Sequence, residues 1–297
     1  MKYAFYPGCS VHSSTTKEYE DSAKAVCNVL DVELVEIPDW NCCGAIDAVY
    51  SYEPQYSLAL AARNLALAEK MQTDVVTLCS ACFFTLARTN KLFHENPEVK
   101  AKINEALSSI GLSYSGNTKV RHLLEVLLTD VGLEKIKAKV KVPLKSFNVA
   151  SYYGCFLVRP VEIANFDNPD HPTRMDDLVE AIGANKIEYY SKTRCCGASM
   201  AITNEKVMLE LSKNILLDAK NSGANVMITA CPLCQFNLDA KQKDIESNFE
   251  IEIGLPILHF TQLMGLAFGI DDKTLGIKKN IVSPIKILPQ TNEVISK

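Results

Sequence analysis

The stretch DVVTLCSACFFTL at residues 74–86 returns later in the chain as VMITACPLCQFNL at residues 226–238. In each copy a short apolar run precedes a C-x-x-C motif. Two other segments recur in the same order: YAFYPGC at residues 3–9 returns as VASYYGC at 149–155, and CCGA at 42–45 returns at 195–198. Recurrence in a fixed order indicates two copies of one structural unit.

The last segment of each copy also corresponds. KVRHLLEVLL at residues 119–128 matches PILHFTQLMG at 256–265, and His122 falls opposite His259. Each unit then has about 140 residues, an ordinary domain size, and the two join near residues 140–146. We expect an N-terminal repeat at 1–144, a C-terminal repeat at 145–270 and an extended tail at 271–297.

Short β-rich runs alternate with helical patterns within each unit. We expect strands at residues 3–6, 32–37, 75–78, 147–153, 186–190 and 226–229, and helices at 18–30, 55–71, 176–182 and 204–220. This alternation predicts an α/β fold of two pseudo-symmetric repeats with parallel sheets flanked by helices. The cysteines follow strand-like runs, and ligands collect at the carboxyl ends of parallel strands. We therefore expect two cysteine sites near the interface between the repeats.

Composition narrows the class of protein. Of 297 residues, 47% are apolar and 22% charged, which predicts a packed globular body. The net charge of -4 does not indicate nucleic-acid binding. The start, MKYAFYPGCS, lacks the apolar core of a signal peptide, and the longest apolar stretch, 257–270, is too short for a membrane span. These features predict a soluble cytoplasmic protein, where eleven cysteines indicate metal or redox chemistry more than disulfides.

Ten of the eleven cysteines form two parallel sets. The spacing is C-x32-CC-x35-CxxC in the first set and C-x39-CC-x34-CxxC in the second. The members are Cys9, Cys42, Cys43, Cys79 and Cys82 in the first, and Cys155, Cys195, Cys196, Cys231 and Cys234 in the second. Cys27 belongs to neither set and sits in an apolar helical pattern, as a small buried hydrophobe would.

Ligand count indicates the kind of metal site. Side chains of adjacent residues in a strand point to opposite faces, so a vicinal pair reaches one site only if the backbone bends or the metal body is large. Gly44 and Gly197 follow the pairs and permit such a bend. A closed zinc site or a cubane cluster takes four ligands, whereas each set offers five. A cluster of several irons fits best; structural zinc remains the alternative.

The order of a single Cys, then CCG, then CxxC, present twice, resembles the cysteine-rich CCG domain family, and over residues 1–270 the layout is similar to the B subunits of heterodisulfide reductases. The resemblance implies that each five-cysteine set, and so all ten cysteines named above, holds one noncubane 4Fe-4S cluster. It implies that the two clusters reduce the mixed disulfide of coenzyme M and coenzyme B to two thiols, one electron coming from each.

The same resemblance implies partners. The chain lacks the C-x2-C-x2-C-x3-C-P run of ferredoxins, so cubane clusters belong on another subunit. In the resembled complexes of methanogenesis, which bifurcate electrons through a flavin, a C subunit carries cubanes and an A subunit carries FAD. A hydrogenase or formate dehydrogenase is a possible electron donor. Relatives with the same repeats serve hydroxy-acid or succinate oxidation, so an iron-sulfur electron relay is the alternative.

Four residues outside the cysteine sets are candidates for the chemistry. His122 and His259 begin the last helix of each unit, where a histidine donates a hydrogen bond to sulfur or supplies a proton, or is simply satisfied by local backbone. Lys192 and Arg194 precede the second CCG and are candidates for holding anionic groups of the substrate, with solvated surface as the alternative.

Two segments are expected to be irregular. Residues 159–174, RPVEIANFDNPDHPTR, are rich in Pro, Asn and Asp and predict a loop, on which Arg159, His171 and Arg174 are candidates for lining an entrance. The tail at 271–297 contains KNIVSPIKILPQ, whose two prolines predict an extended strap over the domain or onto a partner instead of a helix.

Overall fold

A computed structural model describes residues 1–12, 16–45 and 53–288. The elements of the first repeat are β1 (Lys2–Tyr6), α1 (Cys9–His12), α2 (Lys17–Val29), β2 (Glu33–Glu36), α4 (Pro54–Glu69), β3 (Val75–Thr77), α5 (Ser80–Glu95), α6 (Pro97–Ser108), β4 (Val120–His122), α7 (Leu123–Val126), the π-turn η1 (Leu127–Val131) and α8 (Leu133–Ala138).

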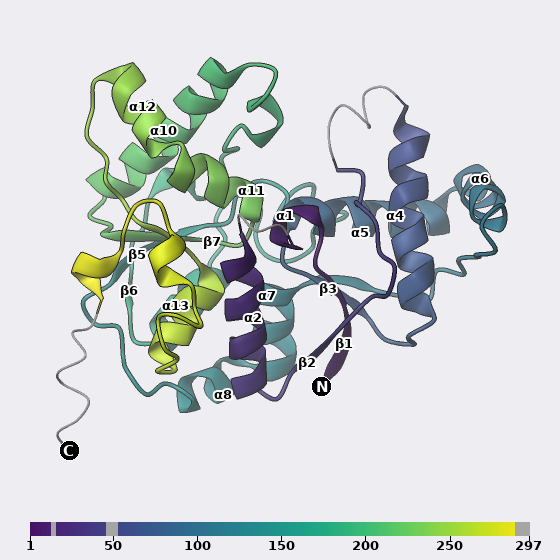
Figure 1. The fold of residues 1–297 in the computed structure, drawn as a ribbon, viewed down its shortest axis with the longest axis horizontal. Coiled ribbons are helices and arrows are strands. Elements are labelled where there is room, and N and C mark those ends of the chain that lie inside the picture. Colours follow the sequence, from purple (N-terminus) through teal and green to yellow (C-terminus); the bar gives the residue numbers. More distant parts are fainter. Residues whose placement is uncertain (13–15, 46–52, 289–297) are drawn as a thin grey trace.

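The second repeat follows the same plan (Figure 1). Its elements are β5 (Asn148–Tyr152), α9 (Arg174–Ala181), β6 (Asn185–Lys186), η2 (Tyr190–Thr193), η3 (Ala198–Met200), α10 (Glu205–Asn221), β7 (Val226–Thr229), α11 (Pro232–Gln235), η4 (Phe236–Ala240), α12 (Gln242–Phe249), β8 (Ile257–His259) and α13 (Phe260–Ala267), followed by the 3-10 turns η5 (Ile277–Lys279) and η6 (Ile285–Ile287).

Each repeat contains one four-stranded parallel sheet, and the strand orders, β2-β1-β3-β4 and β6-β5-β7-β8, are equivalent. The central strands are buried on both faces, as parallel sheets covered by helices require. In β1, Ala4 pairs with Val35 on one side and with Val75 on the other. The predicted α/β fold of two pseudo-symmetric repeats is confirmed.

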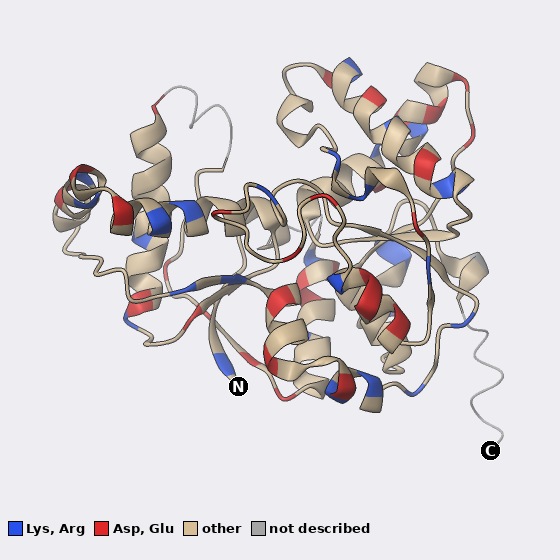
Figure 2. Ribbon diagram, turned by 180° about the vertical axis from the view of Figure 1, so that it is seen from behind, with Lys and Arg blue, Asp and Glu red and all other residues tan. Residues whose placement is uncertain are grey.

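Local sequence explains where the helices form. The buried side of α2 carries apolar residues at three- and four-residue steps: Tyr19, Ala23, Val26 and Cys27. Asn96 caps α6 by accepting the amide hydrogens of Glu98 and Val99, and Pro54 stands at the first position of α4. The charged side chains lie mainly on helices and loops, with both signs mixed (Figure 2).

Several details differ from the sequence prediction, which did not include the helices α5, α6 and α12. The strand expected at 186–190 is only Asn185–Lys186, because the chain leaves the sheet after Lys186 and turns at η2, just before the vicinal cysteines. The short strands β4 and β8 precede the final helices and went unpredicted, since three residues give too weak a periodicity. The loop at 159–173 is confirmed, and Arg174 already begins α9.

The two repeats meet through helices. Helix α2, which follows β1 in the chain, packs on α13, the last helix of the second repeat. Helix α8 of the first repeat packs on α9 of the second. Between α2 and α13 the hydroxyls of Ser22 and Thr261 lie 2.7 Å apart and are fully buried. Both repeats therefore contribute helices to the interface.

The tail follows the surface of the second repeat as far as residue 288. The backbone amides of Ile281 and Val282 donate to the Asp239 carboxylate at 2.8 and 2.9 Å, and the Asn280 amide donates to the Ile257 carbonyl. Residues 271–288 form turns and two short 3-10 helices and contain no strand; the rest of the predicted tail, 289–297, lies outside the described residues. No helix in the described part of the chain combines the length and hydropathy of a membrane span.

Candidate functional site

The ten repeated cysteines gather at the carboxyl ends of the strands. Cys9 begins α1 just after β1, and Cys79 is the N-cap of α5 just after β3. Cys155 and Cys231 occupy the matching places after β5 and β7. None of the eleven cysteines, all within the described ranges, forms a disulfide. Cys43, Cys79, Cys82, Cys196, Cys231 and Cys234 are buried, while Cys9 and Cys195 are exposed.

The sulfur atoms lie close together within each set and between the sets. The Sγ atoms of Cys43 and Cys82 are 3.3 Å apart, and those of Cys196 and Cys234 are 3.6 Å apart. Across the repeat boundary, Cys79 Sγ lies 3.9 Å from Cys231 Sγ. Two thiolates that share a tetrahedral metal with bonds of about 2.3 Å are about 3.8 Å apart. The 3.3 and 3.6 Å distances within the sets are therefore short enough for thiols of one metal site.

In each set, hydrogen bonds lower the pKa of one thiol. Hydrogen bonds from Cys42 and then Cys82 hold the pKa of the Cys43 thiol well below its usual value. Those from Cys234 and then Cys79 do the same for Cys231. A thiolate is the form that binds metal, so these two thiols are ready to bind one. Hydrogen bonds with neighbouring thiols raise the pKa of Cys79, Cys82 and Cys234, and a metal's positive charge would favour their thiolate forms. Cys27, by contrast, is buried in α2, and burial raises its pKa to about 12.

A tight bend at each vicinal pair directs both thiols toward one centre. Gly44 and Gly197 each have φ of 78°, the left-handed region that favours glycine. Their amides point back to the first sulfur of the pair, at 3.4 Å from Cys42 Sγ and 3.3 Å from Cys195 Sγ. A Cβ on Gly197 would lie 2.9 Å from the Cα of Met208, so only glycine fits there.

A tyrosine holds each of these bends in place. The Tyr6 hydroxyl donates at 2.8 Å to the carbonyl of Asn41, the residue before Cys42. The Tyr152 hydroxyl donates at 2.6 Å to the carbonyl of Arg194, the residue before the second pair. Both tyrosines end the first strand of their repeat. The sequence repeat contains this signal, but its role depends on the bend and was not predicted.

His122 joins the two repeats. Its Nε2 lies 3.1 Å from the Leu78 carbonyl and 2.9 Å from the Ala230 carbonyl, and each carbonyl belongs to the residue just before a CxxC motif. Carbonyls only accept, so Nε2 carries the hydrogen, while Nδ1 accepts the Leu124 amide at 3.2 Å. Burial lowers the pKa of this ring to about 4. His122 is thus a neutral ring that links the two repeats through hydrogen bonds to their backbones.

His259, the repeat counterpart, makes a different contact. Its ring stacks on Tyr19 with centroids 3.7 Å apart and planes within 6°. Both residues are fully buried, and neither the His259 Nε2 nor the Tyr19 hydroxyl has a hydrogen-bond partner among the described residues. Burial raises the pKa of Tyr19, and the nearby thiols of Cys231 and Cys79 add to this. Polar atoms left open beside the sulfurs fit a polar group bound there.

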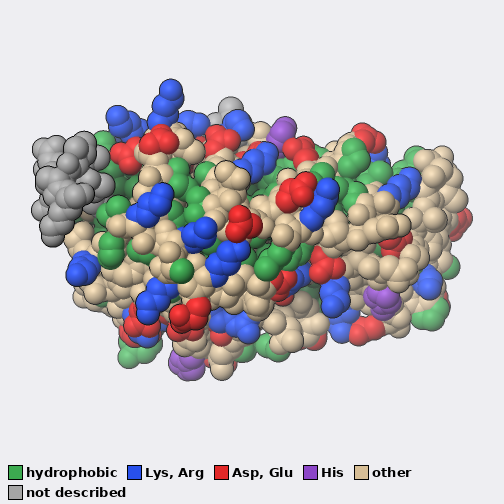
Figure 3. Space-filling view, turned by 90° about the horizontal axis from the view of Figure 1, so that it is seen from below, with side chains coloured by type: hydrophobic (Ala, Val, Ile, Leu, Met, Phe, Trp, Pro, Cys, Tyr) green, Lys and Arg blue, Asp and Glu red, His purple; other side chains and the backbone are tan. Residues whose placement is uncertain are grey.

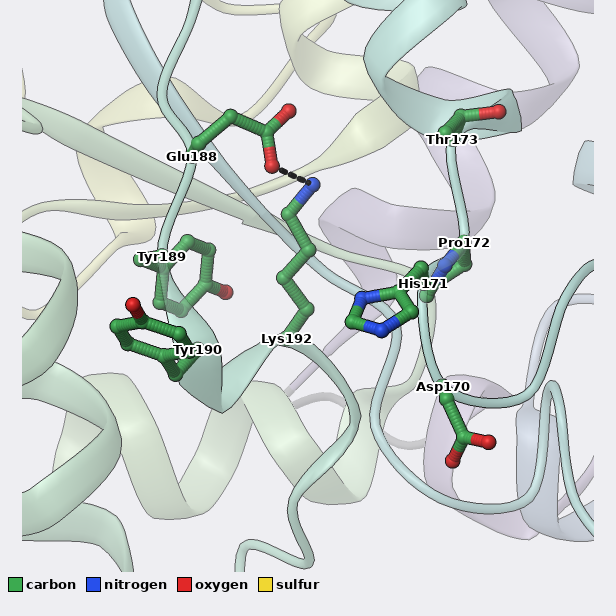
Figure 4. A pocket seen from close by; sticks show the side chains of 8 residues that line it. All are labelled: Asp170, His171, Pro172, Thr173, Glu188, Tyr189, Tyr190 and Lys192. Carbon is green, nitrogen blue, oxygen red and sulfur yellow. Dashed lines mark ion pairs between the residues drawn. The ribbon is translucent and has the colours of Figure 1, made fainter.

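Lys192 forms ion pairs with two carboxylates. Its Nζ lies 2.6 Å from the buried Asp176 carboxylate. It also lies 2.9 Å from the Glu188 carboxylate (Figure 4). Burial opposes the charge, but these two carboxylates outweigh it and raise the pKa of Lys192. Lys192 is therefore no longer a candidate for holding an anion. Arg194 is exposed beside Cys195 and forms no ion pair with a described side chain, so it stays a candidate.

The loop at 159–173 contacts the segment that leads to the second vicinal cysteine pair. Arg159 donates to the Pro169 carbonyl at 2.7 Å and to the Thr193 hydroxyl at 2.9 Å, which ties the loop to the approach of the second vicinal pair. Arg174 lies over the Phe166 ring at 5.5 Å. His171 and Lys192 line one cavity of about 320 Å³ (Figure 4). Arg159 and Arg174 therefore hold the loop together.

Comparison with known proteins places these features in context. The cysteine-rich domain CCG matches residues 3–87 and 149–239. The chain is 34% identical to the B subunit of a ferredoxin/F420H2-dependent CoB-CoM heterodisulfide reductase from Methanosarcina acetivorans, over 99% of this chain and 98% of that protein. It is 37% identical to the 8-methylmenaquinol:fumarate reductase membrane anchor subunit of Wolinella succinogenes, over 96% and 99%.

A solved structure supports the fold. A hypothetical protein from Helicobacter pylori superimposes with a TM-score of 0.75 at 15% identity. The match covers 95% of this chain but 52% of that one, so this chain spans about half its length. At that identity the likeness establishes the architecture alone.

Proposed function

The chain belongs to the cysteine-rich CCG domain family, and from that premise we propose that it binds two noncubane 4Fe-4S clusters, one held by each five-cysteine set. The relatives named as heterodisulfide reductase subunits support an iron-sulfur oxidoreductase role. When bound, each cluster supplies one electron at a time. Residues of the chain hold both thiol sets, orient them and exclude water from the seam between the repeats.

The observation that carries the proposal is the 3.9 Å contact between Cys79 Sγ and Cys231 Sγ. Two centres attached on either side of this contact can both reach one substrate. Reduction of a disulfide takes two electrons and two protons and gives two thiols, so paired one-electron donors avoid a free thiyl radical. We therefore propose that the chain reduces the coenzyme M–coenzyme B heterodisulfide to its two thiols.

The proposal includes the surrounding complex. Relatives are subunits of heterodisulfide reductase complexes, which supports partner subunits for this chain. We propose a cubane-bearing C subunit and a FAD-bearing A subunit as these partners, fed by a hydrogenase or formate dehydrogenase. Arg194, exposed beside the second site, is the cation that we propose for an anionic group of the substrate.

Metal analysis and spectroscopy test this function. We expect about eight irons and eight sulfides per chain and no zinc. Cys79→Ser or Cys231→Ser should remove about half of the iron, whereas Cys27→Ala, outside both sets, should keep all of it. Adding the heterodisulfide to the reduced protein should change the paramagnetic signal of the clusters. Full clusters with an unchanged signal would reject the disulfide substrate and retain the clusters.

An electron relay is the second candidate. The 37% identity to a subunit of a fumarate reductase favours it, as does the burial of the sulfurs at the seam. In that case the clusters would accept and pass on electrons, and the heterodisulfide would neither bind nor alter their signal. The same spectroscopic titration separates the two functions.

A further inference from the structure

A cavity of about 650 Å³ lies where the two repeats and the tail meet. Its residues include Ser10, next to Cys9, and Leu233, which lies between Cys231 and Cys234. Ile281 of the tail forms part of the rim. The cavity thus borders a cysteine-bearing helix of each repeat, α1 and α11, and these two helices contact one another. Its volume is in the range of small-molecule sites.

Two polar side chains in this cavity have an atom without a partner. Glu18 and Gln235 are each only 6% exposed. Neither the Glu18 Oε2 nor the Gln235 Oε1 has a hydrogen-bond partner among the described residues. The Gln235 Nε2 donates at 2.8 Å to the Ile257 carbonyl, which fixes the amide so that Oε1 is the open atom. An unpaired buried polar atom costs about 1–3 kcal/mol, so both atoms favour a ligand that donates hydrogen bonds.

Charge restricts the ligand further. Glu18 and Asp239 contribute carboxyl groups to the cavity, and these repel an anion. A cation is disfavoured because Lys279 Nζ, 4.0 Å from Glu18 Oε2, already offsets the charge of Glu18, although it is too far away to form a hydrogen bond. The Asp239 carboxylate already accepts the amides of Ile281 and Val282. The remaining walls are largely apolar and include Pro232, Leu233, Phe236 and Ile281. The cavity therefore matches an uncharged, largely apolar molecule with hydroxyl donors.

We propose that this cavity binds a hydroquinone, with one ring hydroxyl donating to Gln235 Oε1 and the other to Glu18 Oε2. The apolar ring accounts for the walls, and the two donors account for the two open acceptors. A redox-active ligand suits a cavity bordered by cysteine-bearing helices from both repeats. The anionic groups of a coenzyme M–coenzyme B disulfide are not matched here, so this site is separate from the one that Arg194 would serve.

Calorimetry on the purified, cluster-containing protein tests the site. The probe is 1,4-naphthohydroquinone under anaerobic reducing conditions, and we expect saturable binding at one site per chain. Gln235→Leu should weaken it about tenfold, the loss of one hydrogen bond. The exposed Gln55, on α4, gives the matched control, and Gln55→Leu should bind as the wild type does. Ile281→Trp should block the mouth without altering a buried hydrogen bond.

Two further probes test the chemistry of recognition. The dimethyl ether 1,4-dimethoxynaphthalene keeps the ring but lacks donors, so it should bind at least about tenfold more weakly. The cation 1-naphthylmethylammonium should also bind more weakly. Equal binding of the ether, tighter binding of the ammonium compound, or unchanged hydroquinone affinity in Ile281→Trp would each overturn the proposal. Iron content and the response to heterodisulfide are measured separately, so failure here leaves the proposed function unaffected.

Discussion

The Nε2 atom of His122, in the first repeat, lies 2.9 Å from the Ala230 carbonyl oxygen in the second. The same nitrogen lies 3.1 Å from the Leu78 carbonyl, so one hydrogen is shared across the repeat boundary. Ala230 and Leu78 directly precede Cys231 and Cys79, whose sulfurs are 3.9 Å apart. One neutral ring therefore fixes the two backbone segments that set this distance.

Replacing each histidine by phenylalanine should give unequal results. His122→Phe leaves two buried carbonyls without their shared donor, and we expect a loss of about 2 kcal/mol in the free energy of unfolding. His259→Phe keeps the stacking on Tyr19 and removes an Nε2 without a described partner, so its cost should stay below about 1 kcal/mol. Urea denaturation measures both free energies of unfolding. Equal losses would contradict the role of His122 in linking the two repeats.

Acid should destabilise the fold through these same rings. Burial lowers the pKa of His122 to about 4 and that of His259 to about 3, whereas an unfolded histidine has a pKa of about 6.5. Below about pH 6.5 the unfolded chain binds protons that the folded chain does not, so the free energy of unfolding decreases as the pH is lowered. Each ring should cost about 2 kcal/mol between pH 7 and pH 5.

The Asp239 carboxyl has the opposite effect on how stability depends on pH. Burial raises its pKa to about 6, so the folded state holds a proton that the unfolded state lacks, and stability rises as pH falls through 6 toward 3.8. The comparison of wild type with His259→Phe cancels this contribution. The variant should lose about 2 kcal/mol less than wild type between pH 7 and pH 5 in urea denaturation; identical slopes would show that His259 is not buried neutral.

The tyrosines behind the vicinal cysteines offer a paired test. Tyr6→Phe and Tyr152→Phe each remove a hydroxyl that donates to the carbonyl before a CC pair. Each should lower stability by about 1–2 kcal/mol and reduce the iron retained by its own repeat. Tyr190→Phe is the control, because the Tyr190 side chain is 92% exposed. Iron analysis after mild chelation reads the result, and losses as small as in the control would contradict this role.

Lys192 and Arg194 should separate stability from substrate binding. Lys192→Met leaves the Asp176 carboxylate buried and unpaired, which should cost about 3–5 kcal/mol in unfolding free energy. Arg194→Met removes an exposed cation and should leave stability within about 0.5 kcal/mol. If Arg194 holds an anionic group, its loss should raise KM for the heterodisulfide by about tenfold with little change in kcat. An unchanged KM would remove Arg194 from the site.

Charged side chains of both signs lie on the surface of the molecule. Positive and negative side chains are interspersed over the face seen from below in Figure 3. This mixture of signs accompanies a net charge of -4 for the whole sequence.

Much of the molecule could be predicted from the repeat in its sequence. Local pattern predicts the α/β class and the placement of the cysteines after strands. It can do so because strand and helix periodicities and glycine bends are short-range properties. Strands of three residues, such as β4 and β8, escaped because so few residues carry no clear period. The end of β6 also escaped, since it depends on where the chain must turn to deliver Cys195.

The sequence by itself determined that ten cysteines form two equivalent sets of five, because each motif is contiguous and its chemistry belongs to the residues that it contains. Only the tertiary structure decided that Cys79 and Cys231 meet, and that the matched histidines diverge, one linking the two repeats and one stacked on Tyr19. The tertiary structure also pairs Lys192 with Asp176, and it leaves the Gln235 Oε1 atom in a cavity without a hydrogen-bond partner among the described residues. These contacts join residues far apart in the chain, and packing across the repeat boundary fixes them.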